Sequence, residues 1–133
     1  MRRGEVWWAS MPDPVGSGPG YRRPYLIVSA DSFNQSRINT VTLNHTPANL
    51  RLADAPGNVR LPSRGTGLSK PSVANVSQVI TIDKSFLTER VGRVPSASMS
   101  DVDEGLRLAL ALLRRGLTSQ RRRGAGRGRG DGL

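Results

Sequence analysis

Proline and glycine break the apolar residues of this chain into short runs, and only one segment repeats them with the period of a helix. The runs are rich in Val, Ile, Trp and Thr, which favour strands. They occupy residues 3–11, 23–31, 39–49, 58–62, 72–82 and 90–95, separated by predicted loops that include 12–20 and 53–57. Short strands and one long helix predict a mostly β fold: a small antiparallel barrel or curled sheet with a C-terminal helix.

The long helix is predicted to begin where Ser98 or Ser100 caps it, with Asp101 or Asp103 three residues further on. The apolar residues that follow share one face at helical spacing: Val102, Leu106, Ala109, Leu110 and Leu113. We expect this face to pack on the sheet. Acidic residues in a first turn are what the helix dipole favours, so we infer no metal site there.

Two shorter helical segments are predicted beside the strands. Asp31 is expected to cap a turn over residues 32–37. Residues 84–89 are expected to form a turn or a short helix before the final strand.

Length and composition narrow the class of protein. The 133 residues suit one ordinary domain. The chain has no cysteine, which excludes disulfides and thiolate zinc sites and favours a reducing compartment, the cytoplasm. The longest apolar run near the start is too short for a signal peptide or a membrane span, so we expect a soluble protein with no membrane partner.

Positive charge is concentrated at the C-terminal end of the chain. Residues 1–113 carry 13 Lys and Arg against nine Asp and Glu, whereas residues 114–133 carry seven Arg against one Asp. The last segment has no apolar periodicity, so we divide the chain into a folded domain, 1–113, and a disordered Arg/Gly-rich tail, 114–133. The tail either adds affinity for any polyanion through phosphate contacts or is only solvated charge.

Most catalytic machinery is absent from the sequence. There is no cysteine nucleophile, no phosphate-binding loop with its lysine, and a single histidine, His45. One reaction needs little of this machinery: RNA transphosphorylation, in which the substrate's own 2′-hydroxyl attacks the phosphorus and an arginine stabilises the oxyanion. Arg22 or Arg23 suits this role, because Pro24 fixes a strand start directly after the loop 12–20. The alternative is an arginine pair that only blunts a strand edge.

Several segments, taken in order, resemble the MazF/PemK (Kid) toxins of type II toxin–antitoxin systems. They are RRGEVWWASMPDPVGSGPGYRRPYLIVSAD, DAPGNVRLP, SVANVSQVITIDKSFLTERVGRVP and DVDEGLRLALALL, which span Arg2 to about Leu113. The resemblance implies a homodimer of small SH3-like barrels that cleaves single-stranded RNA at short specific sequences. It further implies that no metal or other cofactor is needed, that the products are a 2′,3′-cyclic phosphate and a 5′-hydroxyl, and that an acidic cognate antitoxin binds.

The resemblance also assigns residues. The family's essential arginine, which precedes a proline at the start of the second strand, falls on Arg23. Its second catalytic residue is a Thr or Ser that ends the third strand, and an ungapped count places Pro47 there, with Thr46 one residue earlier and Asn49 at the family's asparagine. Neighbouring strand residues face opposite sides, so either a bulge restores Thr46 to the site or the site is damaged.

The remaining candidates lie around these two positions. Glu5 matches an acidic position common in the family, or else forms an ion pair with Arg3 or Arg23. His45 either transfers a proton or has a structural role. The candidate RNA-binding residues are Tyr21, Arg22, Ser29, Asn34, Asn49 and Gln78.

Two other functions remain open from the sequence. A barrel of the same family that has lost cleavage would bind RNA through its arginines. A toxin similar to CcdB would bind DNA gyrase instead, but such poisons act through a C-terminal helix and need no arginine–proline strand start.

Overall fold

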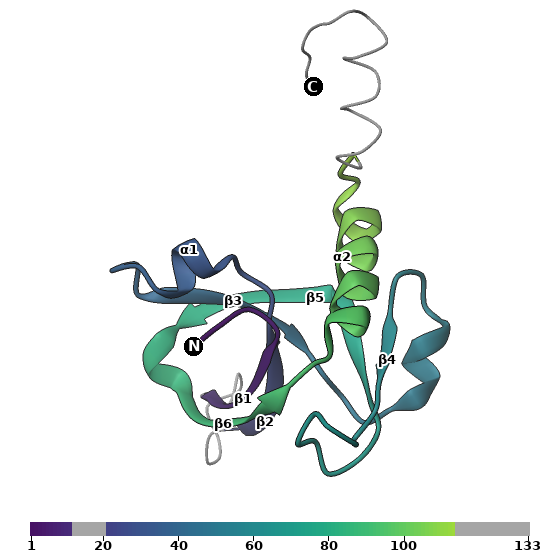
Figure 1. Cartoon of the computed structure of the whole chain (residues 1–133), viewed down its shortest axis with the longest axis horizontal. Helices are drawn as coiled ribbons and strands as arrows, with labels where there is room; N and C mark the ends of the chain where they lie inside the picture. The colour runs from purple at the N-terminus through teal and green to yellow at the C-terminus, as the bar shows by residue number, and fades with distance from the viewer. Residues whose placement is uncertain (12–20, 114–133) are drawn as a thin grey trace, which may run out of the picture.

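The computed structural model describes residues 1–11 and 21–113, a strand-rich chain that ends in a helix (Figure 1). Within these residues the strands are β1 (Glu5–Met11), β2 (Tyr21–Ile27), β3 (Thr40–His45), β4 (Val59–Leu61), β5 (Ser72–Asp83) and β6 (Leu87–Arg93). The helices are α1 (Asp31–Asn34) and α2 (Ser96–Leu110), and two 3₁₀ turns are η1 (Leu50–Asp54) and η2 (Lys84–Phe86). The predicted mostly β fold with a C-terminal helix is confirmed.

All the strand pairs are antiparallel, and the sheet order is β4-β5-β3-β2-β1-β6. The sheet curls into a half-barrel, with α2 standing over β5 and β4 (Figure 1). Because side chains alternate along β2, Leu26 joins one apolar cluster and Ile27 joins another. The first cluster comprises Val6, Leu26, Leu61, Leu68, Ala74, Val76, Val94 and Val102, and the second Ala9, Tyr25, Ile27, Val41 and Leu43.

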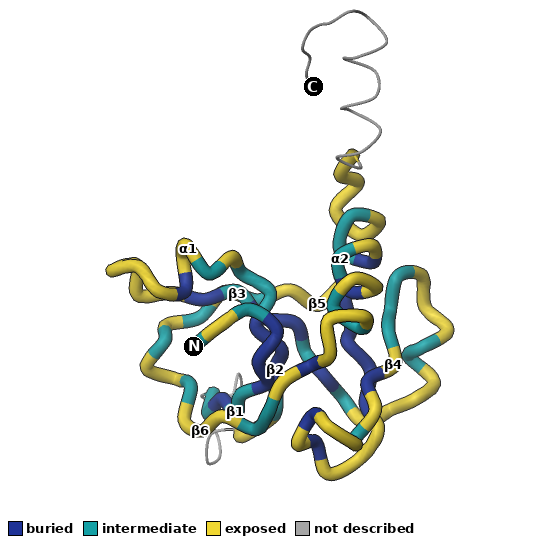
Figure 2. The backbone as a smooth tube through the Cα atoms, in the orientation of Figure 1, coloured by how far each residue is buried: buried dark blue, intermediate teal, exposed yellow. Residues whose placement is uncertain are grey.

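Strand β5 joins the edge strand β4 to the rest of the sheet. Its first half is buried and pairs with β4, while its second half is mostly exposed and pairs with β3 (Figure 2). The register changes in between: Asn44 pairs with Val79, but His45, the next residue of β3, pairs with Asn75. Residues 76–78 therefore stand outside the ladder with β3, and such a bulge bends the strand that carries it.

Helix α2 packs closely on the rest of the fold through a contact between two glycines, Gly105 of the helix and Gly57 of the loop before β4. A Cβ at Gly105 would collide with the carbonyl oxygen of Gly57, and Gly57 has a φ of 81°, which favours glycine. Val102, one turn earlier, is fully buried in the first cluster. The contact fixes α2 over the loop before β4.

The predicted start of the helix is wrong. Helix α2 begins at Ser96 rather than after Ser98 or Ser100, its N-cap is Pro95, and no side chain caps it. The chain enters the helix directly at Pro95, whose fixed φ suits a helix start. Asp103 instead accepts a hydrogen bond from the Arg3 guanidinium, with 2.6 Å between Nη2 and Oδ1.

The predicted apolar face of the helix is only partly buried. Val102 is buried and Leu106 packs against the first cluster, but Ala109, Leu110 and Leu113 are exposed. The helix extends beyond the edge of the sheet (Figure 1), so its last turn has nothing within the described residues to cover it. It ends at Leu110, and Leu113 lies outside it.

Several predicted strand boundaries also move. The first strand begins at Glu5 rather than at residue 3, and the second runs over Tyr21–Ile27 rather than over residues 23–31. The third strand ends at His45 and not at residue 49, because Pro47 has no N–H to donate to a ladder. The last strand begins at Leu87, inside the segment expected to be a turn or helix, and ends at Arg93.

Asp31 does not cap the first short helix. The N-cap of α1 is Ala30, and Asp31 is the first helical residue. Its carboxylate accepts hydrogen bonds from the backbone N–H of Arg3 and from the Asn34 amide, which together lower the pKa of Asp31.

The segments 12–20 and 114–133 lie outside the described residues, so the mobile loop and the disordered tail stay predictions. In the part that is described, no helix is both long and apolar enough to span a membrane. No group of three or more His, Asp or Glu side chains is placed there to hold a metal ion.

Candidate functional site

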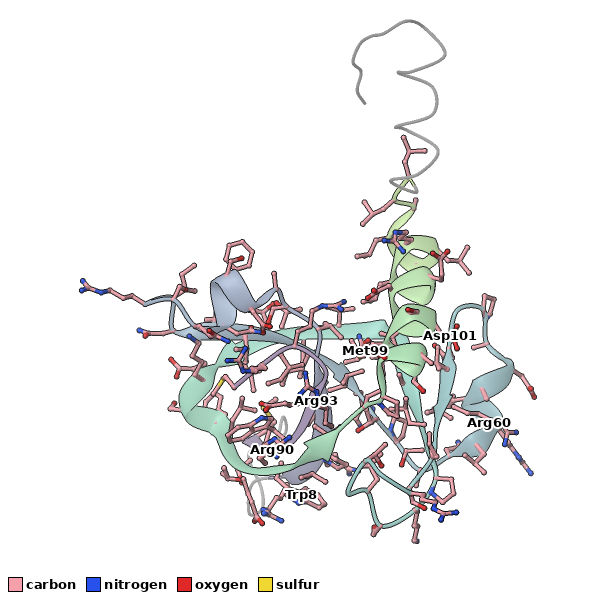
Figure 3. The ribbon with its side chains drawn as sticks, in the orientation of Figure 1. Trp8, Arg60, Arg90, Arg93, Met99 and Asp101 are labelled. Carbon is pink, nitrogen blue, oxygen red and sulfur yellow. The ribbon has the colours of Figure 1, made fainter. Side chains whose placement is uncertain are left out.

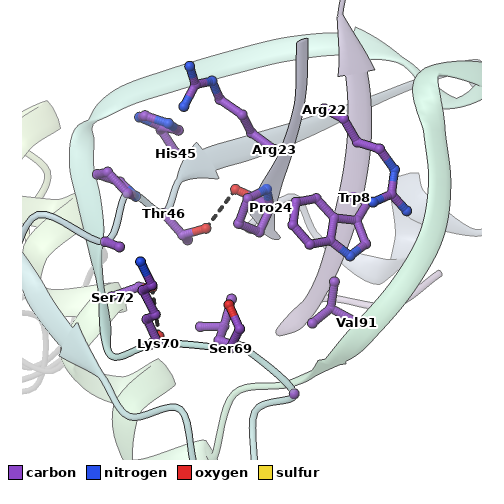
Figure 4. Close-up of a pocket in the computed structure, with 14 residues that line it drawn as sticks. Trp8, Arg22, Arg23, Pro24, His45, Thr46, Ser69, Lys70, Ser72 and Val91 are labelled. Atoms are coloured by element: carbon purple, nitrogen blue, oxygen red, sulfur yellow. Dashed lines mark hydrogen bonds between the residues drawn. The ribbon is translucent and has the colours of Figure 1, made fainter.

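A cavity of about 320 Å³ opens where the start of β2, the end of β3 and the loop before β5 meet (Figure 4). The residues that line it are Trp8, Arg22, Arg23, Pro24, His45, Thr46, Pro47, Ala48, Gly67, Leu68, Ser69, Lys70, Ser72 and Val91. Three of these side chains are cationic and none is a carboxylate. The cavity therefore suits an anion.

Arg23 lies at the cavity on β2, directly before Pro24. Its partner in the register with β1 is Ala9, and its side chain is exposed. In Figure 4 it runs from the Pro24 end of the cavity toward His45. Burial raises the pKa of the neighbouring Tyr25 hydroxyl, although the charge of Arg23 acts in the opposite direction. The hydroxyl of Tyr25 therefore stays protonated although the Arg23 guanidinium is near it.

Thr46 reaches the same cavity despite the proline that follows it. Its side chain is almost fully buried, and its hydroxyl donates a hydrogen bond to the Pro24 carbonyl, with 2.6 Å between the oxygens. Pro47 accepts a backbone hydrogen bond from Val73 of β5. The bulge expected in the strand that carries Thr46 is not found: β3 ends at His45, and the extra residues of the register shift lie on β5.

His45 is held by a chain of side chains. Its Nδ1 lies 3.0 Å from Oε1 of Gln78, and the same oxygen accepts a hydrogen bond from the Asn75 amide. Because an amide oxygen only accepts, Nδ1 is the donor in this contact, and Nε2 is the ring nitrogen that Gln78 does not engage. The ring also stacks at a tilt on Tyr25, with 5.4 Å between centroids.

Arg22 and Trp8 form another wall of the cavity. The guanidinium carbon lies 4.5 Å from the centroid of the indole ring, and Nη2 donates to the Glu89 carboxylate at 2.9 Å. The sheet explains this grouping, because Trp8 is opposite Glu89 on β6 and Pro24 on β2, which makes Arg22 its diagonal neighbour. Figure 3 shows Trp8 at this edge of the molecule.

Sequence reasoning missed the loop that supplies Ser69 and Lys70 to the cavity. The loop is fixed against β6: a Cβ at Gly67 would collide with the carbonyl of Val91, and a Cβ at Gly92 with the carbonyl of Thr66. The signal in the sequence is the stretch GLSKPS, a basic residue between glycine and proline ahead of a strand.

Glu5 does not line the cavity. It is largely buried, and its carboxylate accepts hydrogen bonds from the backbone N–H of Arg2, from the Trp7 indole and from Arg90. The expected ion pair with Arg3 or Arg23 is therefore wrong, since the partner is Arg90 of β6. Burial alone would raise the pKa of Glu5, but these hydrogen bonds and the Arg90 charge lower it overall.

The structure also places three candidate RNA-binding residues away from the cavity. The Asn34 amide is buried and bonds to the backbone and side chain of Ser29, whose hydroxyl accepts from the backbone N–H of Thr42. Asn49 caps η1 through the N–H of Arg51. The three residues have local structural roles, and the side chain of Tyr21 lies outside the described residues.

Comparison with known proteins identifies the relatives of this chain. Residues 2–110 match the model of a family described as the PemK-like, MazF-like toxin of type II toxin–antitoxin systems. Endoribonuclease MazF6 of Mycobacterium tuberculosis is 46% identical over 112 residues, which are 84% of this chain and 98% of that protein. Endoribonuclease EndoA of Bacillus subtilis is 32% identical over 113 residues, 85% of this chain and 97% of that protein.

Solved structures share the fold. A mycobacterial endoribonuclease in complex with its cognate antitoxin aligns with a TM-score of 0.67 at 26% identity, over 86% of this chain and 98% of that chain. A MazE–MazF crystal structure from Deinococcus radiodurans gives a TM-score of 0.71 at 20% identity, over 85% of this chain and 97% of that chain. The second likeness concerns the fold alone.

Proposed function

The chain belongs to the PemK-like, MazF-like toxins of type II toxin–antitoxin systems, and we propose that it is an endoribonuclease that cuts single-stranded RNA at a short specific sequence. The observation that carries this proposal is that Arg23 and Thr46 line the same cavity. The charged side chains that line this cavity are all cationic. A phosphodiester is the anion of RNA, and guanidinium groups bind phosphate oxygens in pairs.

In the proposed reaction, the 2′-hydroxyl of the RNA attacks the adjacent phosphorus and the 5′-oxygen of the next nucleotide leaves. Negative charge grows on the phosphoryl oxygens as the phosphorus becomes pentacoordinate. Arg23 stabilises this charge, since its guanidinium stays protonated and its position on β2 beside Pro24 is fixed before the substrate binds.

Thr46 positions the RNA, and His45 carries the proton. The Pro24 carbonyl orients the Thr46 hydroxyl on the cavity wall, where it holds the RNA backbone beside the reacting groups. Nε2 of His45 takes up the proton, because Gln78 holds Nδ1 and leaves the Nε2 lone pair available. The same proton then serves the leaving 5′-oxygen.

The nucleophile belongs to the substrate, so the chemistry requires neither a bound water nor a metal ion. The products of this route are a 2′,3′-cyclic phosphate and a 5′-hydroxyl. An enzyme with this substrate works where cellular RNA is, and we place the chain in the cytoplasm.

The partners in this proposal are RNA, a second copy of the chain and an acidic antitoxin. A mycobacterial relative of similar fold has been solved with its cognate antitoxin. The cationic cavity suits an acidic protein segment for the same reason that it suits phosphate, and a segment seated there would exclude RNA.

Incubation of the full chain with a long unstructured RNA in the presence of EDTA tests the proposed function. We expect discrete cuts at one recurring sequence, with 5′ ends that need phosphorylation before ligation and 3′ ends that carry a cyclic phosphate. An RNA with a 2′-methoxy group at the mapped site should bind without being cut. Binding with no cleavage of unmodified RNA would favour the non-catalytic barrel instead, and cleavage of the 2′-methoxy RNA would exclude attack by the substrate's own hydroxyl.

A further inference from the structure

The wall of the cavity formed by Trp8 and Arg22 has no role in the proposed chemistry. Trp8 is half-buried, with its indole at the cavity and the Arg22 guanidinium 4.5 Å from the ring centroid. Arg22 is held by Glu89 in an ion pair whose two side chains are 45% and 66% exposed. An exposed pair of this kind is weak and readily exchanged.

The chemistry of this wall fits one kind of group. A planar cation resting on an indole occupies the position that a flat aromatic ring would take by stacking. The cavity beyond it carries Arg23 and Lys70, which suit phosphates. A flat ring joined to a phosphate is the repeating unit of a nucleic acid, and stacking of a base on an aromatic side chain is stronger than an exposed cation–π contact.

The second ring that lines the cavity is less suited to stacking. His45 is bonded to Gln78 and lies against Tyr25. The indole of Trp8, by contrast, has the exposed Arg22 side chain over its ring face. Trp8 also lies on β1 between β2 and β6, so its backbone is fixed on both sides.

We propose that Trp8 is the nucleobase-stacking residue of this site, and that Arg22 occupies the ring face in the unbound protein. A base of the RNA displaces the guanidinium from the indole. Arg22 leaves Glu89 and moves to a phosphate next to that base. This inference rests on the proposed function, because it takes RNA as the substrate, and it assigns a base-binding residue to the same site.

The test uses Trp8 as its own reporter. The chain has two tryptophans, so the Trp7→Phe variant leaves Trp8 as the only indole. The probe is an oligonucleotide of about 10 nucleotides that contains the mapped cleavage sequence with a 2′-methoxy block. We expect its binding to quench the Trp8 fluorescence. An acidic peptide such as polyglutamate should not reproduce the quenching, and quenching by the peptide but not by the RNA would overturn the inference.

A second measurement locates the stacked base. Each base of the probe is removed in turn to leave an abasic position, and affinity is measured for the wild type and for Trp8→Leu. One position should weaken binding about 5- to 150-fold in the wild type and have little further effect in Trp8→Leu. Trp8→Phe should keep most of the affinity, and Trp7→Phe is the matched control that keeps the stacking ring.

The outcomes separate the two proposals. If the wild type cuts RNA but no abasic position is coupled to residue 8, the stacking role is wrong and the proposed function stands. If the wild type does not cut RNA, the proposed function fails, and the same abasic series in an oligouridylate still tests stacking. Circular dichroism shows whether Trp8→Leu folds. If it does not, Trp8→Phe and the wild type are compared across the abasic series. The inference would be overturned if no abasic position weakened binding to either protein.

Discussion

Two buried asparagines of this protein have opposite surroundings. Asn34 is 3% exposed, and its amide bonds to Ser29 and Asp31. Asn44 is fully buried on β3, beside Leu26 in the register with β2, and neither its amide nitrogen nor its oxygen has a hydrogen-bond partner within the described residues. A buried amide without partners is destabilising by about 1–3 kcal/mol.

Replacement of these two residues should therefore change stability in opposite directions. Asn44→Leu removes the unpaired polar atoms, keeps the same branching of the side chain and should raise the free energy of unfolding. Asn34→Leu, the matched control, removes three hydrogen bonds and should lower it. Denaturant unfolding measures both, and a lower midpoint for Asn44→Leu than for the wild type would show that this amide has a partner that stabilises the fold.

Arg23 permits the sharpest prediction about catalysis. Arg23→Ala should preserve the fold, because this side chain is exposed and belongs to neither apolar cluster. Turnover should fall on the order of a hundredfold to a thousandfold, the usual effect of losing one oxyanion partner. Arg23→Lys should recover little, since an ammonium cannot bond two phosphate oxygens in the same way.

Single-turnover cleavage, with circular dichroism as the check on folding, separates Arg23 from its neighbour. Arg22→Ala is the matched control: it should weaken RNA binding more than it slows cleavage of bound RNA. Unchanged turnover by Arg23→Ala would mean that another group stabilises the phosphorane.

At the scale of elements, Glu5 joins β1 to β6 through Arg90. The register between these strands shifts on both sides of Trp7 and Trp8, so the ladder itself is irregular here. The buried carboxylate, with Arg90 and the Trp7 indole as donors, supplies contacts where the ladder is uneven. We infer that this cluster contributes to the pairing of β1 with β6.

The cluster should make stability depend on pH. The pKa of Glu5 in the folded protein lies below its ordinary value of 4.5. Its contribution is therefore complete at neutral pH and is lost as the pH falls from about 4.5 through the folded-state value. Glu5→Gln should be less stable than the wild type at neutral pH, and denaturant titrations over a pH series should show the difference narrowing in acid. A constant difference at all pH values would assign the effect to packing.

The contact of α2 with the sheet gives a second prediction at this scale. An alanine is normally favoured over glycine in a helix by about 1 kcal/mol. At Gly105 the added methyl would meet the carbonyl of Gly57, so we expect Gly105→Ala to lower the melting temperature. Ser100→Ala, on the exposed face of the same helix, is the control and should leave it unchanged or slightly higher. Equal or greater stability of Gly105→Ala would mean that the helix shifts without cost.

The elements that the sequence predicts well are those whose own residues determine them. Apolar runs between proline and glycine predict the strands, and they place the arginine before Pro24 on the second strand, although that strand begins two residues earlier, at Tyr21. The helix start was misplaced because serines and acids form capping patterns at several positions, whereas the entry at Pro95 depends on where β6 ends. Lys70 was missed because only the contact of Gly67 with β6 brings its loop to the cavity.

The whole molecule leaves apolar surface uncovered. Four leucines at the end of α2 are each more than half exposed: Leu108, Leu110, Leu112 and Leu113. Exposed apolar patches on a small domain mark surfaces that associate, and closed dimers are the commonest homo-oligomers.

We therefore predict a homodimer. Sedimentation at micromolar concentration should give twice the chain mass of 14.4 kDa. Dilution should reveal the monomer together with a loss of RNA cleavage. A monomer that keeps full activity would contradict the prediction.

The two glycines that fix the loop before β5 have a consequence for how such a protein changes over generations. Gly67 of the loop packs against the carbonyl of Val91 on β6, and Gly92 of β6 packs against the carbonyl of Thr66 in the loop. A side chain at either position would therefore displace the loop. Ser69 and Lys70, which that route carries to the cavity, are both exposed and make no part of either apolar cluster. Mutations there should leave the scaffold intact, so under the proposed function natural selection could alter how this loop meets the RNA without first having to rescue folding.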